Sequence, residues 1–332
     1  MPFLSHIIKE RQDSPLRLDR YVSEKLCILS RSQIKTRALR ADINGKNVKL
    51  SRYVKYGDLL ELRWDESPPL NLIPQNIPLD IIYEDERCVV VNKPQGMVVH
   101  PGAGNKQGTL ANALCFRQRN NTAVDAANVD KTTVDDKIPE AVNKLNDSLR
   151  PGIVHRLDKD TSGIIIAAYD EEALVFLSGQ FKSRKVKKYY IAVTCGNPEA
   201  RGRIETFIAR DSNNRKRFTV LESGSNAANG KLAVTFFKVI KSWDNYSLVL
   251  LRPRTGRTHQ LRVHMRHLGC PILGDPVYGK ADKNFPQAGL MLHSKKLVVT
   301  LPGEAKEKIF SSQMPERFTD LINKLDRMSA ND

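Results

Sequence analysis

The chain has 332 residues, which is long for one average domain and long enough for two units with a substantial core. Its 53 Lys and Arg residues outnumber 37 Asp and Glu residues, which gives a formal net charge of +16. This excess favours a polyanionic partner, with nucleic acid ahead of an anionic membrane surface.

Two features of the sequence argue against a secreted or membrane-embedded protein. The 5 cysteines are widely spaced and never arranged as C-x-x-C, which favours reduced thiols over a disulfide framework or a zinc ribbon. No apolar run approaches the roughly 18 residues that span a bilayer, and "MPFLSHIIKERQD" at the N-terminus lacks the apolar core of a signal peptide. We therefore expect a cytoplasmic protein that does not associate with membranes.

Residues 14–75 are expected to form a small unit of their own. Apolar residues recur at helical spacing over residues 18–26, and a second helix is predicted to begin near residue 30. The pattern then changes to short alternating runs, with turn signals at Asn44–Gly45 and Gly57–Asp58. This pattern predicts two helices followed by a small sheet.

Basic residues crowd this first unit, either as an ordinary solvated face or as a surface for nucleic acid. The stretch "RLDRYVSEKL…SRSQIKTRALRADINGKNVKLSRYVKYGDLLEL" resembles an S4 domain, a small α/β RNA-binding module. The resemblance implies that the unit grips phosphates of structured RNA and supplies affinity rather than chemistry. The cations expected to do so are Arg31, Lys35, Arg40 and Lys46.

A Pro-rich segment, "DESPPLNLIPQNIPLD", separates this unit from a second one at residues 76–330, with the boundary near residue 75. The second unit contains many short β-like runs, among them "CVVVNK", "MVVH", "GIIIAA", "KKYYIAVT", "YSLVLL", "LMLHS" and "KLVVTL". Helical patterns interrupt them near residues 109–117, 171–181, 258–268 and 315–325. Because strands outnumber helices and often sit only a turn apart, we predict an α+β domain on a mostly antiparallel mixed sheet.

Residues 118–148 are polar, free of aromatic side chains and weakly patterned, and we expect them to form a flexible insertion.

Two motifs suggest a cofactor or a metal, but neither fits the pattern that such a site requires. The glycines of "HPGAGNKQGT" match neither the dinucleotide fingerprint nor Walker A, and we expect no cofactor. His264, His267 and Cys270 could share one side of a helix, but a fourth ligand is not apparent and neighbouring Arg262 and Arg266 would repel a cation. We therefore expect no metal.

A burst of charge in "HRLDKDTSG", residues 155–163, follows an apolar segment and precedes "IIIAA". Asp158 in this burst is expected to be positioned rather than freely solvated, and residues 160–163 can form a tight turn. Taken alone, the stretch is equally compatible with a turn residue and with a catalytic carboxylate at Asp158.

Two later stretches favour the catalytic alternative. "KSRKVKKYYIAV" places a run of cations ahead of Tyr189 and Tyr190, which suits phosphates and base stacking. "LRPRTGRTHQLRVHMRHLGCPILGD" contains five arginines, and a buried arginine beside Asp158 would keep it ionised and aimed.

"HRLDKDTSG", "KYYIA" and "RTGRTHQLRVHMRHLGCPILGD" occur in the order and approximate spacing of the RluA-type pseudouridine synthases, which this chain resembles. "VVVNKPQGMVVHPGAGNKQGTLANAL", residues 89–114, is most similar to the ribosomal large-subunit pseudouridine synthase D branch of that family. The resemblance implies isomerisation of uridine to pseudouridine in structured RNA, with large-subunit ribosomal RNA as the expected substrate and transfer RNA as the alternative. It implies no cofactor and no obligate protein partner.

The resemblance also implies roles for individual residues. Asp158 is the expected catalytic carboxylate, which either attacks C1′ or removes the C2′ proton. Tyr190 is expected to pack against uracil and help remove the C5 proton, while Arg262 pairs with Asp158. Arg156 is expected to fill the space left by the flipped uridine, and His155 to be structural. Further RNA contacts are expected from Lys185, Lys188, Arg254 and Arg257.

Two other functions stay open at this point. The chain could be an RNA-binding adaptor of the S4 type whose second domain has lost its chemistry. It could also be a metal-dependent RNA hydrolase that uses the histidines near residue 264.

Overall fold

The structure, a computed structural model, describes residues 2–9, 15–26, 28–29, 34, 38–65, 72–102, 104–127, 152–214, 217–221 and 230–330. The chain divides into two compact units, Met1–Asn71 and Leu72–Asp332. The division lies close to the predicted boundary at residue 75. Within the described residues, no helix is both long and apolar enough to cross a membrane.

The first unit is a small sheet with a helical segment. Its sheet has the order β1-β6-β3-β4, and a separate pair joins β2 to β5. The elements are β1 (Phe3–Ile7), β2 (Leu16–Arg17), α1 (Leu18–Arg20), the π-helical turn η1 (Tyr21–Lys25), β3 (Arg40–Ile43), β4 (Lys46–Asn47), β5 (Tyr53–Val54) and β6 (Leu59–Arg63). The predicted turn at Asn44–Gly45 connects β3 to β4, and both residues have positive φ, as a tight hairpin requires.

This unit begins earlier than predicted. Strand β1 pairs antiparallel with β6 from Phe3 to Ile7, so the sheet includes residues ahead of the expected start at residue 14. Leu18, Tyr21 and Val22 are buried in the core, as their helical spacing predicts. Most of the predicted second helix, including Arg31 and Lys35, lies outside the described residues.

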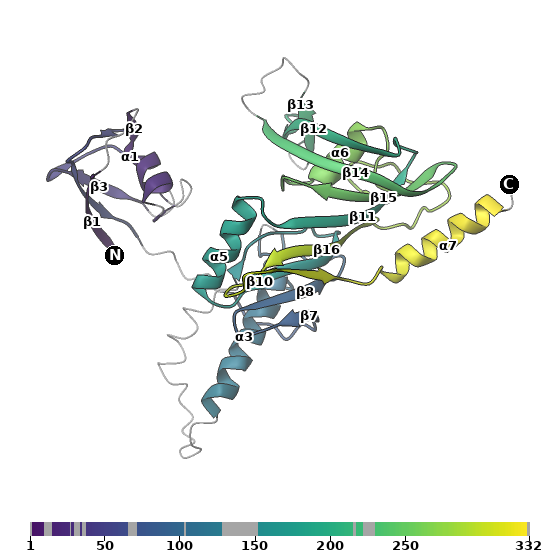
Figure 1. Cartoon of the computed structure of the whole chain (residues 1–332), viewed down its shortest axis with the longest axis horizontal. Helices are drawn as coiled ribbons and strands as arrows, with labels where there is room; N and C mark the ends of the chain where they lie inside the picture. The colour runs from purple at the N-terminus through teal and green to yellow at the C-terminus, as the bar shows by residue number, and fades with distance from the viewer. Residues whose placement is uncertain are drawn as a thin grey trace. The chain divides into compact units, whose positions relative to one another are not determined.

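The second unit is built on one large sheet (Figure 1). Its strand order is β13-β12-β14-β15-β11-β16-β10-β8-β7, with β17 on β16 and β9 on β10. The strands are β7 (Asp80–Glu84), β8 (Cys88–Lys93), β9 (Gly152–Ile153), β10 (Ser162–Ala168), β11 (Lys187–Cys195), β12 (Arg201–Arg210), β13 (Phe218–Leu221), β14 (Lys231–Trp243), β15 (Tyr246–Pro253), β16 (Leu292–Thr300) and β17 (Glu307–Ser311). Among these paired strands, β10 and β16 run parallel and the others antiparallel, which confirms the predicted α+β class.

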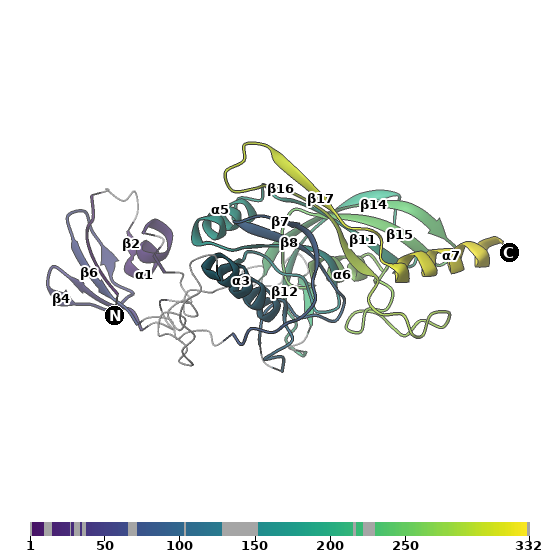
Figure 2. The ribbon, with the colours of Figure 1, turned by 90° about the horizontal axis from the view of Figure 1, so that it is seen from below.

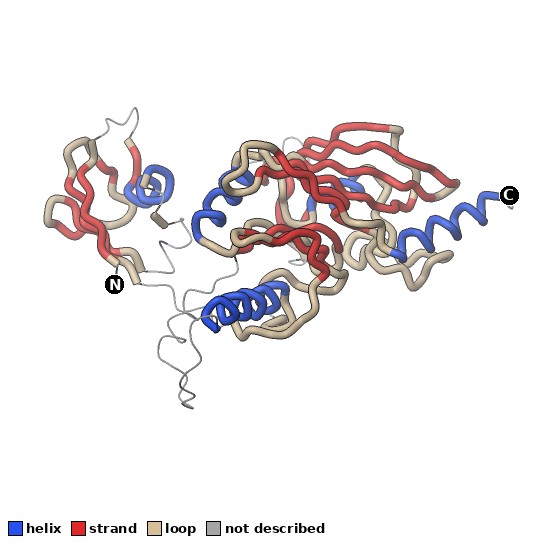
Figure 3. Tube along the Cα trace, turned by 60° about the horizontal axis from the view of Figure 1, so that its bottom comes forward, coloured by secondary structure: helices blue, strands red, loops and turns tan. Residues whose placement is uncertain are grey.

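Helices occur where the sequence predicts them, as α3 (Leu110–Ala127), α5 (Glu171–Lys182), α6 (Gln260–His267) and α7 (Glu316–Ala330). Helix α5 contacts β9 and β10, α6 contacts β13 and β14, and α7 contacts β14. Figure 2 shows α3 beside β7 and β8, and Figure 3 shows the helices arranged around the curved sheet.

Helix α3 corrects one prediction. It continues through Ala127, so residues 118–127 are helical rather than part of a flexible insertion. The physical reason is that this stretch contains neither Gly nor Pro, so no residue in it interrupts the helix that begins at Leu110. The rest of the predicted insertion, residues 128–148, lies outside the described residues.

Strands β12, β13 and β17 were not among the predicted strands. Strand β12 buries Ile204 and Ile208 and exposes most of its other side chains, so its apolar signal is sparse. Strands β13 and β17 are short and lie toward the edges of the sheet. Conversely, "MVVH" is not a strand, and "LMLHS" and "KLVVTL" fall largely within the single strand β16.

Candidate active site

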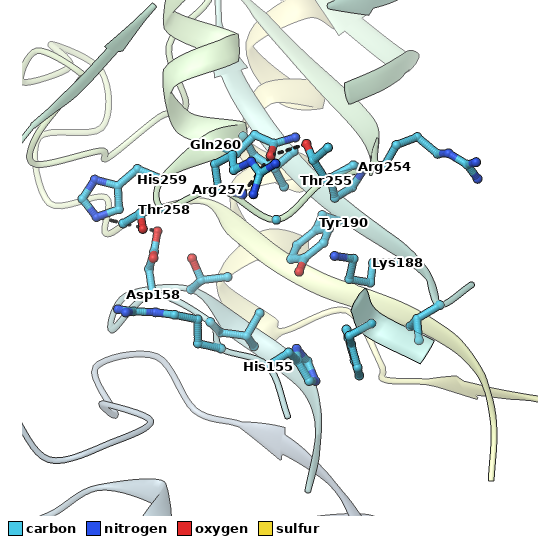
Figure 4. Close-up of a pocket in the computed structure, with 18 of the residues that line it drawn as sticks. His155, Asp158, Lys188, Tyr190, Arg254, Thr255, Arg257, Thr258, His259 and Gln260 are labelled. Carbon is cyan, nitrogen blue, oxygen red and sulfur yellow. Dashed lines mark hydrogen bonds and ion pairs between the residues drawn. The ribbon is translucent and has the colours of Figure 1, made fainter. Parts of the chain in front are cut away.

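A pocket of about 470 Å³ lies in the second unit (Figure 4). Three segments line most of it: the loop 154–161 between β9 and β10, residues 181–190 from the end of α5 into β11, and residues 253–262 from the end of β15 into α6. These are the three stretches that the sequence singled out, and the fold brings them together.

The loop that carries Asp158 is pinned from the protein interior. The Thr161 amide donates to the Asp158 carbonyl at 3.1 Å and closes a turn. The fully buried Lys93 ammonium donates to three carbonyl oxygens, those of Pro94 (2.9 Å), Met97 (2.8 Å) and Lys159 (3.1 Å). Because all three ammonium protons are used on backbone carbonyls, Lys93 fixes the loop that carries Asp158 against residues 94–97.

A glycine lets the same loop enter the sheet. Gly163 has φ +110°, and a Cβ atom there would collide with the backbone of Ser294 on β16. Only glycine allows β10 to begin this close to β16, directly after the turn. Asp158 is thereby held four residues ahead of the fully buried strand β10.

Arg262 binds Asp158, but its stronger partner is Asp275. The Arg262 Nη1 atom lies 3.4 Å from Asp158 Oδ2, whereas Nε and Nη2 each lie 2.7 Å from the Asp275 carboxylate. The Asp275 side chain is fully buried and also accepts the amides of Val277 and Tyr278. Asp275 thus aims the guanidinium, which is 4% exposed, at the 18% exposed Asp158.

The charge on Arg262 is secure. Burial acts to lower its pKa, but the carboxylates of Asp275 and Asp158 together outweigh burial, and its pKa is raised. Arg262 therefore pairs with Asp158, as predicted, and at the same time binds the carboxylate of Asp275. Sequence reasoning missed Asp275, although this residue closes the motif "RTGRTHQLRVHMRHLGCPILGD".

Tyr190 lines the pocket and is buried, with 8% of its surface exposed. Burial raises its pKa to about 12, although a hydrogen bond with Ser294 acts in the opposite direction. The side chain is therefore a neutral phenol at physiological pH. Tyr189 does not line the pocket, and its ring lies 5.3 Å from the Lys296 ammonium, as strand alternation predicts.

The predicted RNA-binding residues fall into three groups. Arg156, Lys188, Arg254 and Arg257 line the pocket. Lys185 is exposed and is not among the lining residues, and Arg40 and Lys46 are exposed in the first unit. Arg31 and Lys35 lie outside the described residues.

The pocket cations differ in how firmly they are held. Burial lowers the pKa of Lys188, whose ammonium lies 5.9 Å from the centre of the Phe181 ring. The Arg257 Nε atom donates to the Leu232 carbonyl at 3.0 Å, and the Arg257 amide donates to Gln260. Part of the role of Arg257 is therefore to shape the loop, which the sequence did not indicate.

His155 has structural contacts. Its Nε2 accepts the Ile166 amide at 3.0 Å, and its ring stacks on Phe181 with the centroids 4.5 Å apart. Burial, followed by the charge of Lys188, lowers its pKa to about 3. A neutral imidazole whose Nε2 accepts a backbone proton is a poor general base, in keeping with the structural role expected for it.

The histidines near residue 264 do not form a metal centre. Both ring nitrogens of the buried His264 face threonine hydroxyls, Nδ1 at 2.9 Å from Thr235 and Nε2 at 3.1 Å from Thr206. Burial, with the charge of His267, lowers its pKa to about 4. Among the described residues, no group of three or more His, Cys, Asp or Glu side chains is placed to hold a metal ion.

Comparisons with known proteins agree with this fold. Residues 87–267 match the family model described as RNA pseudouridylate synthase. The chain belongs to this family, and within it to the RluA type, so it is an isomerase that acts on RNA.

Its relatives and structural neighbours are named accordingly. It is 41% identical to "Ribosomal large subunit pseudouridine synthase D" of Borreliella burgdorferi, over 94% of this chain and 90% of that protein. It is 36% identical to "RNA pseudouridine synthase 2, chloroplastic" of Oryza sativa, over 94% of this chain and 80% of that protein. The solved structure titled "Human RNA Pseudouridylate Synthase Domain Containing 4" matches with a TM-score of 0.53 at 26% identity, over 74% of this chain and 93% of that one.

Proposed function

We propose that this pseudouridine synthase modifies large-subunit ribosomal RNA, with Asp158 as its catalytic carboxylate. The observation that carries the assignment is that Asp158 lies in a pocket beside a buried guanidinium which Asp275 holds in place, with Tyr190 lining the same pocket. Relatives in Borreliella burgdorferi and Zymomonas mobilis, which are named ribosomal large subunit pseudouridine synthase D and are 41% and 34% identical to this chain, support this substrate.

The reaction is an isomerisation. The bond between N1 of uracil and C1′ breaks, the base turns, and a bond between C5 and C1′ forms as the C5 proton leaves and N1 takes a proton. The Asp158 carboxylate serves this reaction either by attacking C1′ or by removing the C2′ proton. Both routes use the carboxylate form of Asp158, whose Oδ2 atom lies 3.4 Å from Nη1 of Arg262.

Tyr190 is a neutral phenol in the free enzyme, because burial disfavours the phenolate. In the proposed reaction its ring packs against the uracil. Its hydroxyl takes part in moving the C5 proton only in concert with another acceptor, since the free phenol is a weak base.

The target uridine has to leave the RNA stack to reach Asp158, at a cost of a few kcal/mol. Arg156 is exposed, lies two residues before Asp158 and lines the pocket. Its planar guanidinium can stack and donate hydrogen bonds at once, so it is suited to occupy the space that the uridine leaves.

In this proposal, RNA affinity comes from cations that take no part in the isomerisation itself. Lys188, Arg254 and Arg257 line the pocket, and the exposed Lys185 lies three residues before Lys188 in the sequence. The first unit contributes as an RNA-binding module of the S4 type, and Arg40 and Lys46 are two of its exposed cations.

The test is to map pseudouridines in ribosomal and transfer RNA from cells that carry the wild-type gene or Asp158→Asn. We expect specific large-subunit sites to return to uridine in the variant. Loss of pseudouridine only from transfer RNA would overturn the proposed substrate, and unchanged pseudouridine everywhere would overturn the assignment of Asp158.

A further inference from the structure

His259 faces the Asp158 carboxylate from the N-terminus of helix α6. Its Nε2 atom lies 3.9 Å from Asp158 Oδ2 (Figure 4). Its backbone has φ +56°, a left-handed conformation that non-glycine residues adopt at an energetic cost. The fold therefore accepts local strain to turn this side chain toward the carboxylate.

A hydrogen-bond chain favours one tautomer of His259. The Phe218 amide on β13 donates to the Tyr278 hydroxyl at 2.8 Å. Because this hydroxyl accepts from an amide, its own proton is free to reach His259 Nδ1, which lies 2.9 Å away. A neutral imidazole then carries its proton on Nε2, pointing at Asp158.

The ring is fixed in orientation and kept neutral by its surroundings. Phe218 and Tyr278 each meet it edge to face, with the centroids 5.6 Å away. Burial lowers the pKa of His259, Asp158 and Asp275 raise it, and Arg262 and Arg156 lower it, with a net lowering. At neutral pH, His259 is therefore a hydrogen-bond donor without a charge.

His259 and Arg262 approach the same carboxylate oxygen, Oδ2 of Asp158. We propose that His259 is a positioning residue for the reaction, whose Nε2–H fixes Oδ2 together with Arg262 so that Oδ1 is presented to the ribose. This inference rests on the proposed catalytic role of Asp158.

The separation of 3.9 Å is too long for a hydrogen bond in the free enzyme. Catalytic hydrogen bonds often tighten only when substrate is bound. In the proposed complex the uridine excludes water from the pocket, and the contact between His259 and Asp158 closes.

Two substitutions separate this role from a purely structural one. In His259→Asn, asparagine tolerates the left-handed backbone and its side-chain amide can still contact Tyr278. The asparagine side chain is too short to reach Asp158. In His259→Gln the amide nitrogen reaches the position of Nε2, but the backbone is less well tolerated and the Tyr278 contact is lost. A donor role therefore ranks Gln above Asn in kcat, whereas a structural role ranks Asn above Gln.

The measurement is tritium release from a ribosomal RNA transcript labelled at uracil C5, at saturating RNA, with melting temperature and RNA affinity measured in parallel. We expect His259→Asn and His259→Ala to lose roughly 10-fold or more in kcat, with KM little changed, and His259→Gln to recover most of the loss. Tyr278→Phe should lower kcat in the wild-type background and add little to His259→Gln.

Equal kcat values for Asn and Gln, or a higher value for Asn, would overturn the proposal. Failure of the proposed function can be told apart from failure of the inference about His259. An inactive wild-type protein or an active Asp158→Asn variant would refute the function. An active wild-type protein with the order of the two His259 variants reversed would refute only the inference.

Discussion

The charged side chains around Asp158 differ from those on the outer surface in their burial and in their partners. Arg262, Asp275 and Lys93 are buried and have their partners within the protein, at distances between 2.7 and 3.4 Å. Lys46 and Lys185 are exposed. The buried group is arranged before RNA arrives, so it should determine stability and turnover, whereas the exposed group should determine affinity.

The largest effect should come from Arg262→Leu, because it leaves the buried Asp275 without its counter-charge. We expect unfolding to become easier by about 3–5 kcal/mol, with a collapse of kcat. Arg262→Lys keeps the charge without the two-pronged geometry, and should retain more stability than activity. Chemical denaturation measures the first effect and tritium release the second.

The matched control is Arg266→Leu, which makes the same change at an exposed position of the same helix. It should leave stability within about 0.5 kcal/mol of wild type. Equal destabilisation by the two variants would contradict the distinction between buried and exposed charge.

Lys93→Met should come second, since it removes the donor for three backbone carbonyls beneath the loop that carries Asp158. We expect a loss of about 1–3 kcal/mol of stability and a lower kcat, because the loop that carries Asp158 is released. Lys159→Met, at an exposed position in the same loop, is the control for stability.

Lys93→Met should also change how stability depends on pH. Burial lowers the pKa of Lys93 to about 8, below the ordinary lysine value of 10.5. Between these values the unfolded chain binds more protons than the folded one, so stability should rise with pH across this window in the wild type. In Lys93→Met this rise should be missing, and denaturation midpoints at pH 8, 9 and 10 check it.

Arg156→Ala should have an intermediate effect that depends on the substrate. Turnover on a uridine within paired RNA should fall about 10-fold or more, since flipping costs a few kcal/mol there. Turnover on a short unstructured RNA should change little. An equal loss on both substrates would remove Arg156 from the role of filling the vacated stack.

The smallest effects should follow neutralisation of exposed lysines. Lys46→Gln and Lys185→Gln should each weaken RNA binding several-fold and reduce the slope of log affinity against log salt by about 1. The value of kcat at saturating RNA should stay the same. A loss of kcat without a change in the salt slope would show that these residues act in turnover rather than in affinity.

Sequence reasoning identified the three segments that form the pocket, because each carries a dense local pattern. "HRLDKDTSG", "KYYIA" and "RTGRTHQLR" place Asp158, Tyr190 and Arg262 in register with a known family, and the fold brings all three to one pocket. The helices near residues 171 and 260 were predictable from their apolar spacing.

What the sequence did not reveal depends on pairing between distant segments. Asp275 acquires its role only because its loop returns to α6, and Tyr278 only because β13 donates an amide to it. The partners of Lys93 are backbone carbonyls, which no side-chain pattern reports. Strand β1 was missed for a similar reason, since its partner β6 lies more than fifty residues away along the chain.

The measurement that tests the central claim most directly is pseudouridine formation by Asp158→Asn in a single turnover with excess enzyme on large-subunit ribosomal RNA. The substitution keeps the size of the side chain and removes its charge. We predict that the variant melts close to the wild-type temperature, binds the RNA with similar affinity and forms no detectable pseudouridine. Product formation at a rate near that of the wild type would contradict the account.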